Sequence, residues 1–336
     1  MTHLSPGVRT QTSRNEDGNE REAMMKGQRN GRLNALTIDV EDWFQVTAFD
    51  RNIGFHAWDR CEVRVVENVR RILGLLSEQR IDATFFVLGW IAERYPDLVK
   101  SIHDAGHEVG THGYSHRMIS DLTPREFESD VRRSLRAIEE VTDSRVLGYR
   151  APSYSIVAET SWAWEVLVDL GLRYSSSVFP INHDRYGIPW APRHPFVLRT
   201  NGSGRLVEFP LSTVSVMGRN LPVAGGAYLR LYPYWFIRWG LGRINAEWMP
   251  AVVYFHPWEI DPGQPRQQVG LLSRLRHYTN LDRMERKIHA LFQDFRFSSV
   301  GRVLSTNGFG LHGVHGDWLG EGCLSNEKRS AERSRE

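Results

Sequence analysis

The chain has 336 residues and a formal net charge of +2, with 41% hydrophobic and 24% charged residues. This composition is typical of a globular protein that is long enough to bury an apolar core without disulfides. The near-neutral charge argues against a nucleic-acid partner, because nucleic-acid-binding proteins concentrate basic residues on one face. Cys61 and Cys323 are too few for a disulfide framework and fit unpaired thiols in a reducing compartment.

The two ends of the chain are polar and charged. Residues 1–31 contain no apolar run of signal-peptide length, and residues 313–336 lack a hydrophobic period. Such segments bury too little apolar surface to offset their ordering entropy, so we expect both to be disordered. No stretch reaches the roughly 20 apolar residues that a membrane span needs. The sequence therefore predicts a soluble, cytoplasmic protein without a transmembrane segment.

Apolar runs alternate with amphipathic segments up to residue 180. Strands are expected at residues 33–39, 82–89, 107–112, 146–152 and 173–180. Apolar residues at three- and four-residue steps predict helices at 63–80, 96–106, 124–142 and 161–172. This alternation indicates an α/β protein with a parallel sheet covered by helices, either open or closed into a barrel.

The pattern changes over residues 181–250, where proline, glycine and aromatic residues become frequent. Only 206–212 resembles a strand, and we expect the rest to be an elaborated loop region in the wall of the site. A strand at 251–256 and an amphipathic helix at 279–295 follow. The expected organisation is one folded domain over residues 32–312 between the two disordered ends.

Ionisable side chains follow four predicted strands where each apolar run stops. They are Asp39, Glu41 and Asp42 after the first, His112 and His116 after another, Arg150 after a third and His256 after a fourth. The C-terminal ends of parallel strands open to a common mouth, where active sites of α/β proteins are built. We therefore expect these side chains to form one site.

The residue types at this mouth suit metal-assisted hydrolysis. His112 and His116 are four residues apart, and on a helical turn that spacing would let both rings share one metal ion. Either Glu41 or Asp42 could complete a His-His-carboxylate set that leaves positions open for water and substrate. Asp39 would then be free to act as the general base.

Two further residues complete the predicted chemistry. Arg150 can hold Asp39 ionised and oriented through a charge-assisted hydrogen bond, and His256 is suited to protonate a leaving amine. Each has a structural alternative, namely a salt bridge without a catalytic role for Arg150 and a packed histidine beside Pro257 for His256.

Together these residues resemble the NodB-type polysaccharide deacetylases, carbohydrate esterase family four. The motifs TIDVEDW, HGYSH, RAPSY and FHPW occur in the family's order and spacing over about residues 33–260. Other segments, among them EFPLSTV, NLPVAGGAYLRLYPY and YFHPWEIDP, are similar to the subfamily found in exosortase-associated exopolysaccharide clusters. That similarity extends to about residue 310 and includes a subfamily-specific C-terminal extension from about residue 261.

The resemblance implies a distorted (β/α) barrel, usually of seven strands, that removes N-acetyl groups from amino sugars with zinc or a similar divalent metal. The implied substrate is a polysaccharide or its lipid-linked precursor in exopolysaccharide biosynthesis, with peripheral association with a glycan-synthesis complex as a further expectation. It implies Asp39 as base, His112 and His116 as metal ligands, Arg150 as the residue that orients the base, and His256 as acid.

Two departures from the family pattern concern the site. Val40 occupies the position at which many members carry the metal aspartate, so the carboxylate ligand must be Glu41 or Asp42. Glu41 lies on the same face as Asp39 if the strand continues, by period-two alternation, and Asp42 can reach the site if the chain turns there. Some relatives use the residue two positions after the base, and this resemblance favours Glu41 slightly. Ser175 stands where related sequences commonly have Asp, which leaves one polar support of the site in question.

Aromatic residues in or beside the motifs are candidate substrate contacts, since sugar rings stack on aromatic faces. They are Trp43, Tyr154 and Trp258, and the backbone amide of Tyr154 could also stabilise an oxyanion. Two other functions fit the pattern, an allantoinase-like hydrolase of cyclic amides and a catalytically silent carbohydrate-binding subunit. A complete set of metal ligands and a base favours the deacetylase over both.

Overall fold

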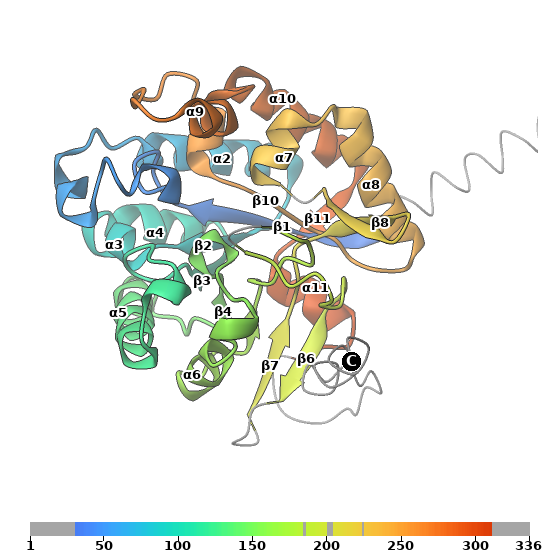
Figure 1. Ribbon diagram of the computed structural model, residues 1–336, viewed down its shortest axis with the longest axis horizontal. Coiled ribbons are helices and arrows are strands. Elements are labelled where there is room, and N and C mark those ends of the chain that lie inside the picture. The colour runs from blue at the N-terminus through green and yellow to red at the C-terminus, as the bar shows by residue number, and fades with distance from the viewer. Residues whose placement is uncertain (1–30, 184–185, 200–203, 224, 311–336) are drawn as a thin grey trace, which may run out of the picture.

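A computed structural model describes residues 31–310, except residues 184–185, 200–203 and 224. The two ends expected to be disordered, residues 1–31 and 313–336, therefore fall outside the described residues, apart from residue 31. A curved sheet forms the centre of the molecule, and helices cover its outer face (Figure 1). None of the helices in the described part of the chain is both long and apolar enough to cross a membrane.

The central sheet has the strand order β10-β1-β2-β3-β4-β5-β7-β6, and β11 also pairs with β1. Every neighbouring pair from β10 to β7 is parallel, whereas β6 and β7 are antiparallel. The bounds are β1 Leu33–Val40, β2 Thr84–Val87, β3 Glu108–Thr111, β4 Gly148–Tyr149, β5 Tyr174–Ser175, β6 Phe196–Arg199, β7 Arg205–Glu208, β10 Val252–Phe255 and β11 Arg296–Ser298. Strands β8 (Thr213–Val216) and β9 (Arg219–Pro222) form a separate hairpin.

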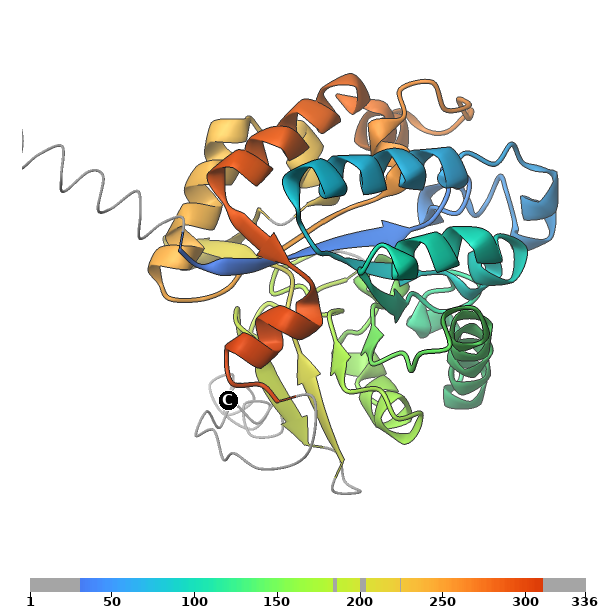
Figure 2. The same ribbon diagram turned by 180° about the vertical axis from the view of Figure 1, so that it is seen from behind.

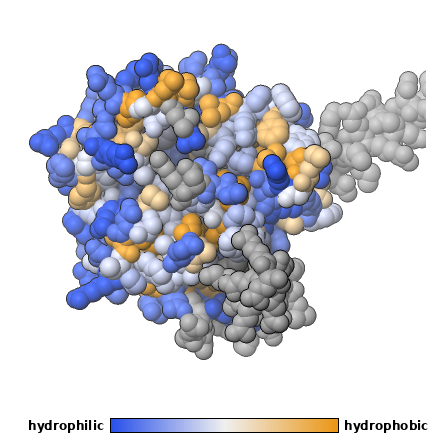
Figure 3. Space-filling model, viewed as in Figure 1, coloured by the Kyte–Doolittle hydropathy of each residue, from blue (hydrophilic) through white to orange (hydrophobic). Residues whose placement is uncertain are grey.

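The helices lie outside this sheet, as the views from both sides show (Figures 1 and 2). They are α2 Val65–Gln79, α3 Gly89–Arg94, α4 Pro96–Asp104, α5 Pro124–Thr142, α6 Ala163–Asp169, α7 Gly226–Leu231, α8 Tyr234–Ala246, α9 Leu271–Tyr278, α10 Leu281–Asp294 and α11 Val300–Thr306. In α2 the periodic residues Val65, Val69, Ile72 and Leu76 are all buried. On the face shown in Figure 3, hydrophobic side chains form small separate groups among hydrophilic ones, because most apolar residues are buried in the core.

The α/β class with a parallel sheet is confirmed, but hydrogen bonds do not close the sheet into a barrel. No ladder in the described part of the chain joins β10 to the other end of the sheet. Loop residues bridge part of that gap: Gly225 pairs with Tyr254, and the Ser212 hydroxyl accepts a hydrogen bond from the Val252 amide at 2.7 Å. The arrangement is that of an open, strongly curved sheet.

The strands and helices predicted before residue 180 are all present, with ends that differ by a few residues. The prediction of a mainly irregular region over residues 181–250 was wrong, since it contains β6, the β8–β9 hairpin, α7 and α8 in addition to the expected β7. Helix α8 escaped the pattern because Trp235 and Trp239 lie on its exposed side, so its sequence does not separate into an apolar and a polar face.

Candidate active site

The four strand ends named above lie side by side in the sheet. Strands β10 and β1 are neighbours, with Ile38 opposite Phe255, and β3 pairs with β4 through Thr111 and Tyr149. Asp39 is the next-to-last residue of β1 and Glu41 follows that strand, while His112, Arg150 and His256 directly follow β3, β4 and β10. The parallel sheet therefore delivers all of them to one edge.

Three buried side chains form a candidate metal centre. One ligand atom each from Glu41, His112 and His116 lies within 4.8 Å of the other two. The Nε2 atom of His116 is 2.8 Å from Oε2 of Glu41, and the two imidazole rings are 5.2 Å apart. The Nδ1 atom of His116 is buried and has no hydrogen-bond partner among the described residues. A buried polar atom left unpaired is costly, so this donor set fits a cation.

Electrostatics favours neutral His112 and ionised Glu41. Burial lowers the pKa of His112 to about 4, although nearby carboxylates oppose it. Burial acts to raise the pKa of Glu41, but His116 and His256 outweigh it and hold that pKa below its ordinary value. A neutral imidazole and a carboxylate are the forms that bind metals.

The two histidines are not on a helical turn, as the sequence analysis assumed. The segment between them is a loop in which Gly113 has φ +75° and His116 has φ +54°. A Cβ atom at Gly113 would lie 2.9 Å from Oδ2 of Asp130, so this position needs glycine. The Nδ1 of His112 lies 2.8 Å from the Arg150 carbonyl oxygen, to which it can donate a hydrogen bond, and this leaves Nε2 for a ligand.

Asp130 holds this loop from helix α5 and was not found from the sequence. Its carboxylate accepts hydrogen bonds from the amides of Tyr114 (2.7 Å) and Ser115 (3.2 Å) and from the Ser115 hydroxyl (2.5 Å). The available signal was its position between Phe127 and Ser134 on the side of α5 that faces the core, an unusual place for an acid.

The structure does not bring Asp42 into the metal set. Its oxygens accept hydrogen bonds from the amides of Trp43, Arg64 and Val65, two of which begin helix α2. Because those amides occupy the carboxylate, Asp42 anchors α2, and of the two alternatives the geometry leaves Glu41 as the candidate ligand.

Asp39 and Arg150 form a buried ion pair beside the histidines. The Nη1 of Arg150 donates to Oδ1 of Asp39 at 2.7 Å and to the Thr37 hydroxyl at 2.6 Å. Burial acts to lower the pKa of Arg150, but Asp39 outweighs it and the net shift is upward. The guanidinium also binds the Ser176 carbonyl and hydroxyl, at 2.9 and 2.8 Å.

Ser175, the second departure from the family pattern, belongs to the support of this pair. Its hydroxyl donates to that of Ser177 at 2.8 Å, and the Ser177 hydroxyl accepts from the Ala151 amide at 2.9 Å. Serine therefore keeps a polar link to the segment that follows Arg150.

His256 faces both carboxylates from the other side. Its Nε2 lies 3.4 Å from Oε1 of Glu41 and 3.9 Å from Oδ2 of Asp39. Its side chain is 16% exposed, against 2% and 3% for Asp39 and Glu41, so it lies nearest the opening. Burial acts to lower its pKa, but Glu41 and Glu259 outweigh it and raise the pKa to about 9.

Glu259 and Arg230 orient His256, and neither was found from the sequence. Oε2 of Glu259 is 2.9 Å from both the Nδ1 and the backbone amide of His256. The Nε of Arg230 donates to Oε1 at 2.5 Å, and the rest of the guanidinium binds the carbonyls of Arg276, His277 and Thr279 at the end of α9. In the sequence, the only local sign of this contact was a charged residue three positions after His256.

The predicted aromatic substrate contacts need correction. Trp43 is 3% exposed and donates to the Glu62 carbonyl, so it belongs to the core. Trp258 is 5% exposed, donates to Oε1 of Glu41 at 3.1 Å and stacks on His256, so it positions the candidate ligand. Tyr154 is 7% exposed with its hydroxyl 3.5 Å from Oδ2 of Asp39, but its amide already donates to the Ala151 carbonyl and is not free for an oxyanion.

The fold and these residues define an α/β protein with a candidate metal site at its strand ends. Residues 49–175 match the family model described as polysaccharide deacetylase, and residues 176–305 match a domain of unknown function, DUF3473. Residues 49–175 of the chain are therefore similar to polysaccharide deacetylases. Of the residues discussed above, His112, His116 and Arg150 lie inside the first match, whereas Asp39 and Glu41 precede it and His256 lies in the second.

Curated relatives are similar over part of their length. The peptidoglycan deacetylase of Helicobacter pylori is 32% identical over 127 residues, which cover 37% of this chain and 42% of that protein. A chitooligosaccharide deacetylase of Sinorhizobium fredii is 36% identical over 97 residues, 29% of this chain and 42% of that protein. The chain thus spans less than half the length of these relatives.

Among solved structures, the "putative polysaccharide deacetylase from Mycobacterium smegmatis" has a TM-score of 0.54 and 22% sequence identity. The superposition covers 86% of this chain and 96% of that one. This likeness supports the fold.

Replacing Asp130 with asparagine tests how the histidine loop is held. Asparagine offers one acceptor oxygen where the carboxylate now receives three hydrogen bonds, so His112 and His116 would be less well positioned. We expect Asp130→Asn to weaken zinc binding about tenfold or more, as loss of an outer support of a metal site usually does. Competition with a chromophoric chelator measures the affinity. Glu128→Gln is the matched control on the same helix, because Glu128 pairs with Arg132 at the surface; equal affinities in all three proteins would contradict the role of Asp130.

Proposed function

We propose that the chain is a metal-dependent hydrolase that removes N-acetyl groups from amino sugars of a polysaccharide or of its lipid-linked precursor. The observation that carries this proposal is the grouping of Glu41, His112 and His116 within 4.8 Å beside Asp39 and His256. The names of the relatives, a peptidoglycan deacetylase and a chitooligosaccharide deacetylase, support the substrate class.

Zinc is the proposed metal, since two imidazoles and one carboxylate are a common ligand set of hydrolytic zinc sites. Glu41, His112 and His116 would hold it, with Trp258 fixing one oxygen of Glu41 and the Arg150 carbonyl fixing the His112 ring. A divalent ion bound there would polarise the acetamide carbonyl and lower the pKa of a neighbouring water.

Asp39 is proposed as the general base. Its carboxylate accepts a proton of the attacking water, while the hydrogen bond from Arg150 fixes its orientation. The water oxygen then adds to the carbonyl carbon, the π electrons of the C=O bond move to the carbonyl oxygen, and a tetrahedral intermediate forms. Asp39 is held by Arg150 and lies outside the ligand set, so it is available for this proton transfer.

His256 is proposed as the general acid. Its raised pKa, near 9, keeps it protonated at neutral pH, and its Nε2 points toward the two carboxylates where the amide would lie. It donates a proton to the amide nitrogen as the C–N bond breaks, which releases acetate and the free amino sugar. Glu259 holds the ring through Nδ1 during this step.

We further propose that the chain belongs to the exosortase-associated subfamily and acts in exopolysaccharide biosynthesis at the cytoplasmic side. In this proposal residues 32–312 form one domain, and a seven-stranded distorted barrel is its family architecture. The seven parallel strands from β10 to β7 support that last assignment, although their ladder is open.

The first test is acetate release from N-acetylglucosamine oligomers by the purified protein. We expect acetate that disappears after chelation and returns with zinc, because the ligand set needs a divalent ion. Asp39→Asn should lower turnover about 10²-fold or more, the usual contribution of a general base, while zinc content stays at the wild-type value. Turnover by Asp39→Asn at the wild-type rate would contradict the assignment of the base.

The same assay separates the alternatives. An allantoinase-like enzyme would hydrolyse allantoin in preference to the oligomers, and a silent subunit would bind oligomers without releasing acetate at any zinc concentration.

Glu259→Gln tests the orientation of the acid. An amide cannot accept from both His256 and Arg230 as the carboxylate does, so the imidazole would lose its fixed position. We expect kcat to fall about tenfold or more with zinc content unchanged. Glu285→Gln, which removes only a partly exposed pair with Arg71, is the control. An unchanged kcat in Glu259→Gln would remove Glu259 from the mechanism.

A further inference from the structure

We propose that the cleft beside the active site binds a negatively charged group, a carboxylate or phosphate, on a sugar that neighbours the N-acetylated one. This inference rests on the proposed deacetylase function and narrows its substrate to an acidic glycan. The evidence is the place of the cleft, the side chains of its walls and the way their charges are separated.

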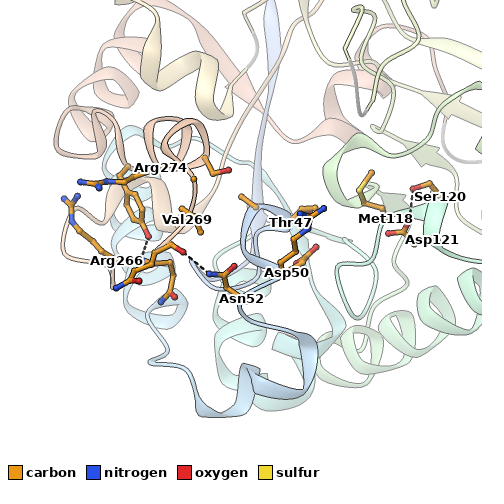
Figure 4. Close-up of a pocket in the computed structure, with 16 residues that line it drawn as sticks. Thr47, Asp50, Asn52, Met118, Ser120, Asp121, Arg266, Val269 and Arg274 are labelled. Carbon is orange, nitrogen blue, oxygen red and sulfur yellow. Dashed lines mark hydrogen bonds between the residues drawn. The ribbon is translucent and has the colours of Figure 1, made fainter.

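The cleft has a volume of about 1210 Å³ and is built by three segments, residues 47–52, 118–121 and 266–278. Each segment continues the chain from a residue of the site: the first follows Glu41, the second follows His116 and the third follows His256. Figure 4 shows Arg266, Val269 and Arg274 on one side, Met118, Ser120 and Asp121 on the other, and Thr47, Asp50 and Asn52 between them.

Contacts join the cleft to the catalytic residues. The Thr47 hydroxyl lies 2.7 Å from that of Ser153, three residues after Arg150. Tyr278, another lining residue, follows His277, whose ring stacks on Trp258 at 4.1 Å. Asp50 lies close enough to His116 and Glu41 for both to act on its pKa, which burial raises. A glycan with one sugar at the metal centre would therefore extend into this cleft.

One wall of the cleft carries two arginines that have no acidic partner among the described residues. Arg266 and Arg274 are exposed and form no ion pair with the described acidic residues. The Arg266 guanidinium lies 5.3 Å from the centre of the Tyr278 ring, which restricts its position. Arginine binds a carboxylate or phosphate through two parallel hydrogen bonds, so a pair of unpaired arginines suits such a group.

Acidic side chains limit what kind of anion fits. Asp121 on the opposite wall and Asp50 between the two walls line the same cleft, and a polymer charged on every unit, such as a nucleic acid, would place phosphates against them. Neutral sugar hydroxyls can instead donate to these carboxylates. The arrangement therefore favours a glycan in which charged and neutral sugars alternate.

The experiment compares two oligomers of equal length, one of N-acetylglucosamine alone and one that alternates glucuronic acid with N-acetylglucosamine. We expect wild-type kcat/KM to be higher for the acidic oligomer. In the double variant Arg266→Gln/Arg274→Gln, kcat/KM for the acidic oligomer should fall about tenfold while that for the neutral oligomer stays within about twofold. Arg283→Gln is the control, since Arg283 is exposed on the next helix, α10, but does not line the cleft.

Binding of the acidic oligomer to the same full-length proteins, measured by calorimetry, tests the anionic subsite independently of catalysis. Binding that weakens in the double variant and not in Arg283→Gln supports the anionic subsite, even if no oligomer releases acetate and the proposed function fails. Equal loss on both oligomers, equal binding by all variants or no binding of the acidic oligomer would overturn the subsite. Acetate release from the neutral oligomer would in that case leave the deacetylase proposal intact.

Discussion

The buried ion pair between Arg150 and Asp39 is the interaction on which the rest of the site depends. A guanidinium with no exposed surface needs hydrogen-bond partners in place of water, and here four hydrogen bonds join it to Asp39, Thr37 and Ser176. Thr37 and Asp39 lie in β1, and Ser176 lies in the segment after β5. One side chain therefore connects β1 to the segment after β5. Removing one member of a buried pair typically costs about 3–5 kcal/mol, because it leaves an isolated charge.

Arg150 also connects Asp39, the proposed base, to His112, one of the candidate metal ligands. Its side chain fixes Asp39 while its carbonyl oxygen binds the His112 ring, so a shift of β4 would move both at once. The parallel sheet supports this coupling, because β1, β3 and β4 lie within four consecutive strands, β1-β2-β3-β4. Strand pairing therefore sets the relative positions of Asp39, His112 and Arg150, whereas His116 depends on the loop that Asp130 holds.

His256, the proposed acid, is held by residues of the region that matches DUF3473 and not by Arg150. Glu259 orients His256, Arg230 neutralises Glu259, and the carbonyls at the end of α9 take up the remaining donors of Arg230. Burial acts to raise the pKa of Glu259, but Arg230 and His256 outweigh it and keep that pKa low. The candidate site therefore draws on three parts of the chain: Asp39 and Glu41 precede both matched regions, the first match supplies His112, His116 and Arg150, and the second supplies the proposed acid, its support and one wall of the cleft.

Strand ends and residue types were enough to predict which ionisable groups meet, but not what holds them. Asp39, His112, Arg150 and His256 follow apolar runs, and that position is visible in the sequence. The partner of Glu259 is Arg230, 29 positions away, and such a pairing has no local signature. Trp43 and Trp258 show why residue type alone fails for aromatics: both were expected at the substrate and both are buried, because an indole suits a core as well as a sugar.

The choice between Glu41 and Asp42 likewise depended on a partner remote in sequence, the amides that open α2. Once those amides occupy Asp42, only Glu41 remains free to face the histidines. Specificity also depends on segments that are remote from one another in the sequence. In the proposed function the residues at the strand ends carry out the reaction, whereas the segments that follow Glu41, His116 and His256 form the cleft. Relatives with the same site but different segments at these three places should therefore share the reaction and differ in the glycan that they accept.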